Sequence, residues 1–256
     1  KWRIEVKNYF TQFIDIVKVS DKEAVNIARN LELDIAIDLS GLTGNPRGGI
    51  FSNRVAPIQI NYLGYPGTYG ADYIDYIIAD ETVIPKENFK FFSEEVLYLP
   101  ECYQSNMKSR EVTKKDFKRS DFGLPEGAFI FSSFNNNYKI TPGMFDIWMQ
   151  ILKNVSNSVL WILKSNETAT LNLKNEANKK DVNPDRIILA DHLPNDEHLK
   201  RIKLADLFLD SFPYNAHTTA SDAVRMGIPI ITLKGQSFHS RVGSSILNCI
   251  NMKELI

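Results

Sequence analysis

The fold is decided by residues 204–233, LADLFLDSFPYNAHTTASDAVRMGIPIITL. An apolar run at 207–209 leads into a polar loop, a stretch with helical spacing at 218–226, and a second apolar run at 229–233. Short apolar runs that do not alternate with polar residues are typical of strands covered on both faces. We therefore predict a strand–helix–strand unit in which the two strands are parallel.

The same pattern extends over the rest of the chain. Apolar runs predict strands at 34–39, 58–63, 76–79, 96–99, 128–133, 158–163, 186–189, 207–209 and 229–233. Helical spacing predicts helices at 22–31, 142–153, 166–180, 196–204, 218–226 and 240–250. From residue 128 onward strands and helices alternate, which predicts a doubly wound parallel sheet with right-handed crossovers.

Composition excludes several classes of protein. The 256 residues suffice for two α/β domains, and a net charge of −1 argues against a nucleic-acid partner. No apolar run approaches the ~18–20 residues that span a bilayer, so we expect no membrane association. The two cysteines, Cys102 and Cys249, show no CxxC spacing, which predicts a cytoplasmic protein without a disulfide framework or structural zinc site.

A polar segment at 104–120, QSNMKSREVTKKDFKRS, carries six Lys or Arg residues against two acidic ones. It is either a solvated linker or a basic contact patch, and the first interpretation is favoured. We place a boundary near residue 120, so that 1–119 form a partial amino-terminal Rossmann-like domain and 120–256 a carboxyl-terminal one. Because the chain starts at Lys1 and stops after a helical pattern, we expect it to be a piece of a longer polypeptide.

The predicted helix at 218–226 opens with Thr218 and Thr219, followed by small residues. A helix start with hydroxyls, unpaired N–H groups and a partial positive charge is suited to a phosphate. Asp222 lies one turn beyond Thr218, where a carboxylate could take ribose hydroxyls. Spacing alone favours a simpler alternative, in which a threonine caps the helix and Asp222 complements its dipole.

Two further loops follow predicted strands. FSSFNNNYKI (131–140) places Lys139 at the carboxyl edge of the sheet, where ligands bind in open α/β folds. LPNDEHLKR (193–201) carries His198, which could stack on a base, and Arg201, which could donate a hydrogen bond to a carbonyl of that base. The alternatives, a solvated lysine and an exposed histidine at a helix start, are favoured for each loop taken by itself.

Glycine-rich loops follow two strands of the first half, at 38–49 and 61–73. They allow a close approach between backbone and ligand. Neither matches the dinucleotide fingerprint or the P-loop, so they are weak evidence by themselves.

Several long stretches nevertheless resemble one family in the same order and at similar spacing: RVAPIQINYLGYPGT, FNNNYKITP, NSVLWILK and LADLFLDSFPYNAHTTASDAVRMGIPIITLKGQSFHSRV. They are similar to the catalytic region of the O-linked N-acetylglucosamine transferases, which include SPINDLY-type plant relatives and bacterial proteins with tetratricopeptide repeats. The resemblance implies a two-domain GT-B fold. It also implies an inverting transferase that moves N-acetylglucosamine from UDP-N-acetylglucosamine to Ser or Thr of a protein acceptor, with no metal and no cofactor.

The resemblance also assigns individual residues. It places Lys139, Thr218 and Thr219 at the diphosphate, Asn136 where the family has a glutamine near the phosphates, His198 and Arg201 at the uracil, Asp222 at the ribose, and His217, Leu63, Gly64 and Thr43 around the sugar. Lys139 and His217 are the expected catalytic residues. The base is expected in a His-Pro loop upstream of residue 1, so the fragment is expected to bind donor while being catalytically incomplete, and tetratricopeptide repeats are expected in the full-length protein.

Two departures leave the donor open. Asn195 stands where animal members have a lysine that contacts the nucleoside, and Asn136 is shorter than the usual glutamine. A GDP-fucose-dependent protein O-fucosyltransferase and a non-catalytic nucleotide-sugar-binding module therefore remain alternatives. An epimerase is the weakest alternative, because the loops hold no pair of carboxylates to flank a sugar.

Overall fold

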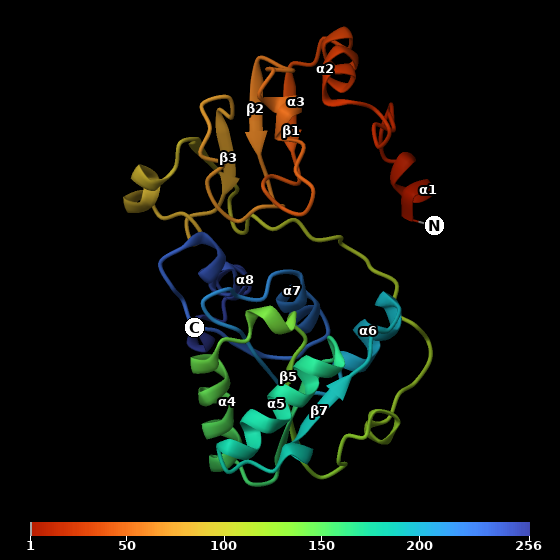
Figure 1. Cartoon of the computed structure of the whole chain (residues 1–256), viewed down its shortest axis with the longest axis vertical. Helices are drawn as coiled ribbons and strands as arrows, with labels where there is room; N and C mark the ends of the chain where they lie inside the picture. The colour runs from red at the N-terminus through yellow and green to blue at the C-terminus, as the bar shows by residue number, and fades with distance from the viewer. Residues whose placement is uncertain (1) are drawn as a thin grey trace. The chain divides into compact units, whose positions relative to one another are not determined.

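The computed structural model describes residues 2–256, and these form two compact units (Figure 1). One unit comprises the chain up to Ala79 together with Glu87–Leu97, and the other comprises Asp80–Lys86 together with Tyr98–Ile256. Residues 98–119, which were grouped with the first half from the sequence, belong to the second unit.

The first unit is built on a sheet with the strand order β1-β2-β3-β4. Its strands are β1 (Ile35–Asp38), β2 (Ile58–Asn61), β3 (Tyr76–Ala79) and β4 (Glu95–Tyr98), and its helical segments are α1 (Trp2–Lys7), α2 (Asp21–Asn30), α3 (Gly48–Phe51) and η1 (Lys86–Phe91). The pairings β1·β2 and β2·β3 are parallel. α2 begins where Ser20 and Glu23 form a capping box, and it buries Ala24 and Val25 against Ala36 of β1.

The second unit is built on a parallel sheet with the order β7-β6-β5-β8-β9. Its strands are β5 (Phe129–Ser133), β6 (Ser158–Leu163), β7 (Ile187–Ala190), β8 (Leu207–Leu209) and β9 (Ile230–Ile231). Renumbered along the unit, this order is 3-2-1-4-5, that of a doubly wound fold. The order reverses between β5 and β8, so the topological switch point lies there.

Helices connect the strands of the second unit (Figure 1). They are α4 (Pro142–Asn154), α5 (Glu167–Lys179), α6 (Asn195–Ile202), α7 (Thr218–Arg225) and α8 (Val242–Cys249), with short turns η2 (Arg119–Phe122), η3 (Asn137–Lys139), η4 (Pro184–Arg186), η5 (Phe238–Ser240) and η6 (Lys253–Leu255). α4 starts as its sequence predicts, because Pro142 takes the first position and the hydroxyl of Thr141 accepts a bond from the N–H of Met144. Trp148 and Met149 of α4 are fully buried against Leu160 of β6.

The predicted strands and helices all appear, within a few residues of their expected bounds, and the predicted fold class of two Rossmann-like parallel sheets is confirmed. The short helices α1 and α3 were not predicted from the sequence, and β9 has two residues, fewer than predicted. Among residues 2–256, none of the helices has the length and apolar character needed to cross a bilayer.

Candidate functional site

The loops that leave β5 and β8 lie side by side, because these two strands pair directly with each other. In open α/β sheets ligands bind beyond the carboxyl ends of the strands at the switch point. The loop after β5 carries Lys139, and the loop after β8 runs from Asp210 to the start of α7 at Thr218. The fold therefore brings together two of the regions that the sequence singled out.

Lys139 reaches across to the second of these loops. Its ammonium donates a 2.8 Å hydrogen bond to the backbone carbonyl of Asn215 and lies 4.2 Å from the ring centroid of Tyr214. Burial lowers the pKa of Lys139 to about 8, although the nearby Asp210 charge raises it. Lys139 is therefore not a freely solvated surface lysine, the alternative that the sequence by itself favoured.

The amino terminus of α7 is the second positive element. The helix begins at Thr218 and its N-cap residue is His217, whose side chain makes no capping bond to any residue that the structure describes. The expectation that a threonine caps the helix is therefore wrong. The hydroxyl of Thr219 instead donates to Asn135 at 2.7 Å, and Thr218 is exposed at the first helical position. The first N–H groups of such a helix point outward with a partial positive charge.

Two imidazoles stack against Tyr214 beside Lys139. The His217 and His239 rings each lie 5.0 Å from the Tyr214 ring, tilted by 24° and 19° respectively. Burial and, to a lesser extent, the Lys139 charge lower the pKa of His217 to about 3, and the same two causes lower that of His239. His217 is therefore a neutral imidazole at pH 7.

Asp210 holds the loop in front of α7 in place. Its Oδ1 accepts hydrogen bonds from the N–H groups of Ser211 and Ala216 at 2.7 and 2.6 Å, and its Oδ2 accepts one from the hydroxyl of Thr232 at 2.6 Å. Burial raises the pKa of this carboxyl to about 6 despite those bonds. The buried Asp210 carboxylate thus fixes the loop and holds Asn215 and His217 in a defined conformation.

α6 supplies a third group of predicted residues. Arg201 is only 1% exposed, and its guanidinium donates to His198 Nδ1 at 3.0 Å and to the carbonyl of Asp191 at 2.5 Å. Burial lowers the pKa of His198 to about 4 and that of Arg201 to about 10. The half-buried imidazole of His198 also meets Phe134 edge-on at 5.1 Å. The expectation of an exposed histidine at this helix start is therefore wrong.

Asp222, on the first turns of α7, is 7% exposed and forms an ion pair with Arg110. Burial raises the pKa of Asp222, while the Arg110 charge and hydrogen bond lower it. Arg110 comes from the basic segment 104–120, so this part of the segment packs against α7, and its role as a contact patch stays a prediction.

Comparison with known proteins identifies the family. Glycosyl transferase family 41 matches residues 1–110 and 105–256, which together cover the chain. The chain belongs to glycosyl transferase family 41. It is 38% identical over 251 residues, 96% of its length, to the Arabidopsis thaliana protein named "probable UDP-N-acetylglucosamine--peptide N-acetylglucosaminyltransferase SEC", of which it covers 26%. It is 24% identical over 368 residues to the Caenorhabditis elegans UDP-N-acetylglucosamine--peptide N-acetylglucosaminyltransferase, covering 32% of it.

A solved structure agrees with the assignment to family 41. A mutant of the Thermobaculum terrenum O-GlcNAc transferase superposes with a TM-score of 0.88 at 25% identity, over 98% of this chain and 48% of that one. The chain spans about a quarter of the length of curated relatives such as the Arabidopsis SEC protein, of which it covers 26%.

Three of the residues expected around a sugar lie in the first unit of this family 41 chain, in the loops after β1 and β2. The hydroxyl of Thr43 donates to the carbonyl of Ser40 at 2.6 Å. Leu63 has a left-handed backbone with φ 72°. A Cβ at Gly64 would fall against the carbonyl oxygen of Leu39 and 2.8 Å from the Cα of Ser40, so glycine lets the two loops approach.

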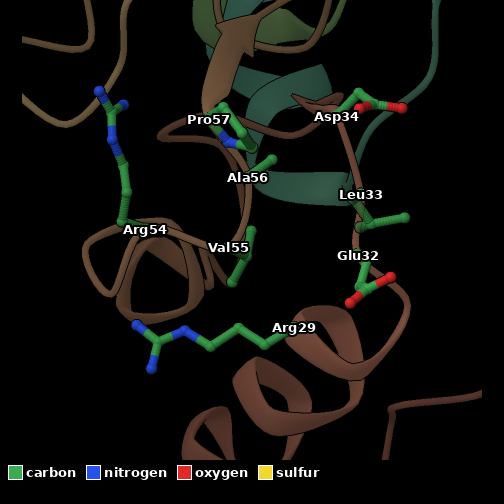
Figure 2. Close-up of a pocket in the computed structure, with 8 residues that line it drawn as sticks. All are labelled: Arg29, Glu32, Leu33, Asp34, Arg54, Val55, Ala56 and Pro57. Carbon is green, nitrogen blue, oxygen red and sulfur yellow. The ribbon is translucent and has the colours of Figure 1, made fainter.

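A cavity of about 410 Å³ lies at the amino ends of β1 and β2, opposite the ends that lead into the loops of Thr43, Leu63 and Gly64 (Figure 2). It is lined by Arg29, Glu32, Leu33, Asp34, Arg54, Val55, Ala56 and Pro57. Arg54 is engaged in a two-pronged ion pair with Asp75, at 2.7 Å for each oxygen. None of the residues predicted for donor binding lines this cavity.

Some residues that surround Lys139 and Asp222 in this family 41 fold were not predicted from the sequence. Tyr214 and His239 contact the site only because two loops distant in sequence fold together.

Asn136 and Asn195, which the resemblance marked as departures, are both exposed at the starts of η3 and α6. Within residues 2–256, no group of three or more His, Cys, Asp or Glu side chains is placed to hold a metal ion.

Proposed function

We propose that this chain is the donor-binding part of an inverting, metal-independent transferase that moves N-acetylglucosamine from UDP-N-acetylglucosamine to Ser or Thr of proteins. Support comes from the relatives, whose names specify UDP-N-acetylglucosamine and a peptide acceptor. The proposed partners are accordingly a nucleotide sugar and a protein. A cytoplasmic location stays a prediction from the sequence.

One observation carries the proposal: the Lys139 ammonium is bonded to Asn215, three residues before α7 begins. When a glycosidic bond to UDP breaks, negative charge accumulates on the diphosphate. A fixed cation and the amino end of a helix stabilise such charge where it develops. In this proposal Lys139 and the N–H groups of Thr218 and Thr219 bind the diphosphate.

The other predicted residues take the remaining parts of the donor. His198 lies at the nucleobase, and Arg201 holds the His198 imidazole in place. Asp222 accepts hydrogen bonds from the ribose hydroxyls. Thr43, Leu63 and Gly64 are proposed at the sugar. These assignments rest on the family resemblance, and the burial of Arg201 favours a supporting role for it over direct contact with the base.

In the proposed reaction the acceptor hydroxyl oxygen forms a bond to C1 of the sugar, on the face opposite the diphosphate. The bond from C1 to the phosphate oxygen breaks, and its electron pair leaves with UDP, so the anomeric centre inverts. The hydroxyl proton passes to a base. With its pKa at about 3, His217 is too weakly basic for that task at pH 7, and a hydrogen bond to the sugar or phosphate suits its neutral ring better.

Calorimetric titration with UDP and GDP tests the donor half of the proposal. We expect UDP to bind and GDP to bind more weakly. Asn195 and Asn136, both exposed, are the departures that favour a GDP-sugar as the donor. Tighter binding of GDP than of UDP would therefore make a GDP-sugar the proposed donor in place of UDP-N-acetylglucosamine. A donor-hydrolysis and peptide-transfer assay on the full-length parent separates a transferase from a non-catalytic binding module.

A further inference from the structure

The segment 103–118, which we call the strap, runs along the two helices that carry the proposed nucleoside residues (Figure 1, yellow-green). Gln104 donates to the buried hydroxyl of Ser221 on α7 at 2.9 Å. Arg225, at the end of α7, donates to the carbonyls of Met107 and Lys108. The part of the strap that precedes Arg110 is therefore fastened to α7.

The strap is also fastened to α6. The N–H of Thr113 donates to the carbonyl of Asp196 at 3.4 Å, and ion pairs join Lys115 to Glu197 at 3.6 Å and Asp116 to Lys200 at 2.9 Å. Exposed pairs of this kind contribute little individually, about 0–1 kcal/mol. Together with the bonds to α7, they fix the course of the strap between the two helices.

Arg110 makes the one charged contact from the strap to a predicted donor residue among those the structure describes. Its Nη1 bonds to Oδ1 of Asp222, and both side chains are largely buried, at 21% and 10% exposure. An ionised carboxylate only accepts hydrogen bonds and has lone pairs on both oxygens, so a bond at Oδ1 leaves Oδ2 as an acceptor for hydroxyls. Arg110 also influences His198, whose pKa its charge helps to lower.

We propose that Arg110 is a positioning residue for the nucleoside, holding the Asp222 carboxylate ionised and aimed at the ribose hydroxyls. The inference rests on the proposed donor site and deepens it. Burying a carboxylate without a partner favours its neutral form, which has lost part of its capacity to accept. Arg110 opposes that effect, so a residue outside the two helices sets how strongly the site recognises ribose.

The test compares UDP with 2′-deoxy-UDP by calorimetry, using the wild type and Arg110→Ala. We expect Arg110→Ala to weaken UDP binding about tenfold, the size of a lost charged hydrogen bond, and to weaken 2′-deoxy-UDP binding much less. The preference for the ribose ligand should therefore shrink. Arg110→Lys, which keeps the charge, should restore part of that preference. A merely structural role would lower both affinities equally.

Lys115→Ala is the matched control, because it removes a strap ion pair to α6 without touching Asp222. We expect it to leave both affinities unchanged. If Arg110→Ala does not fold, Arg110→Gln carries the same comparison with a side chain of similar length. Unchanged UDP affinity, equal losses for the two ligands, or tighter binding would overturn the inference. Failure of the wild type to bind any nucleoside diphosphate would instead overturn the proposed donor site, and the inference with it.

Discussion

The ammonium of Lys139 donates a 2.8 Å hydrogen bond to the backbone carbonyl of Asn215. These residues are far apart in sequence, yet they meet because β5 and β8 are neighbours at the switch point of the sheet. The bond places a cation beside the amino terminus of α7, and the proposed diphosphate site depends on that pairing.

Replacing Lys139 with alanine should weaken UDP binding by about 1.5–3 kcal/mol, the size of a charge-assisted hydrogen bond. Calorimetric titration at pH 7 measures the change. Lys179→Ala is the matched control, because Lys179 is an exposed lysine of the same unit, paired with Glu176. If the two variants bound UDP equally well, Lys139 would not be a phosphate ligand.

UDP affinity should fall as the pH rises through about 8, because burial lowers the pKa of Lys139 to that value and only the protonated form attracts phosphate. The titration is best made from about pH 7 upward, where a terminal phosphate with a pKa near 6 is already ionised. In Lys139→Ala the decline should disappear. A wild-type affinity that stays flat to about pH 9.5 would contradict a role for this ammonium.

Tyr214 should hold the Lys139 ammonium through its ring face, 4.2 Å away. Tyr214→Leu is expected to weaken UDP binding by about 0.5–2 kcal/mol, the range of a cation–π contact. Tyr214→Phe keeps the ring and should bind like the wild type. Calorimetry on both variants decides the matter, since equal losses would point to the phenol hydroxyl instead of the ring.

The free energy of unfolding should decrease as the pH falls below 6.5. In the folded protein the pKa values of His198 and His217 are lowered to about 4 and about 3, from an ordinary value of 6.5. The unfolded chain therefore binds more protons over this range, so the stability that both rings contribute above 6.5 is lost as the pH falls through their folded values. Urea unfolding of the double variant His198→Asn, His217→Asn should show a shallower pH dependence than the wild type. Identical slopes would mean that other groups cause the loss.

Gly64→Ala should destabilise the first unit by about 1–3 kcal/mol, the usual cost of an overpacked site, because its Cβ would fall against Leu39 and Ser40. Thermal unfolding followed by circular dichroism measures the shift. Gly143→Ala is the control: it lies in the first turn of α4, where among the described residues a Cβ meets no heavy atom within 4 Å. That change should be neutral or stabilising.

The sequence predicted the fold well because its signals are local. The apolar run at 207–209 and the small residues after Thr218 are enough to indicate a strand, a loop and a helix in order. Alternation of such units then fixes a parallel sheet and its ligand-binding edge. Lys139 could be singled out for the same reason, since it lies in the loop that follows β5.

The surroundings of the site could not be predicted, because they depend on contacts between distant segments. Nothing local connects Arg110 with Asp222, and an excess of basic residues in the strap was the sole hint. Threonine is a good N-cap residue, yet here the cap position falls one residue earlier, on His217, and Thr219 bonds to Asn135 instead. Tertiary partners, not propensity, decide these details.

The most direct test of the donor site is a crystal structure of the protein with UDP bound. The account predicts the diphosphate within hydrogen-bonding distance of the Lys139 ammonium and of the N–H groups of Thr218 and Thr219, with the ribose at Asp222. Two results would contradict it. UDP could bind elsewhere, or the uridine could contact α6 and α7 while the phosphates lie away from Lys139.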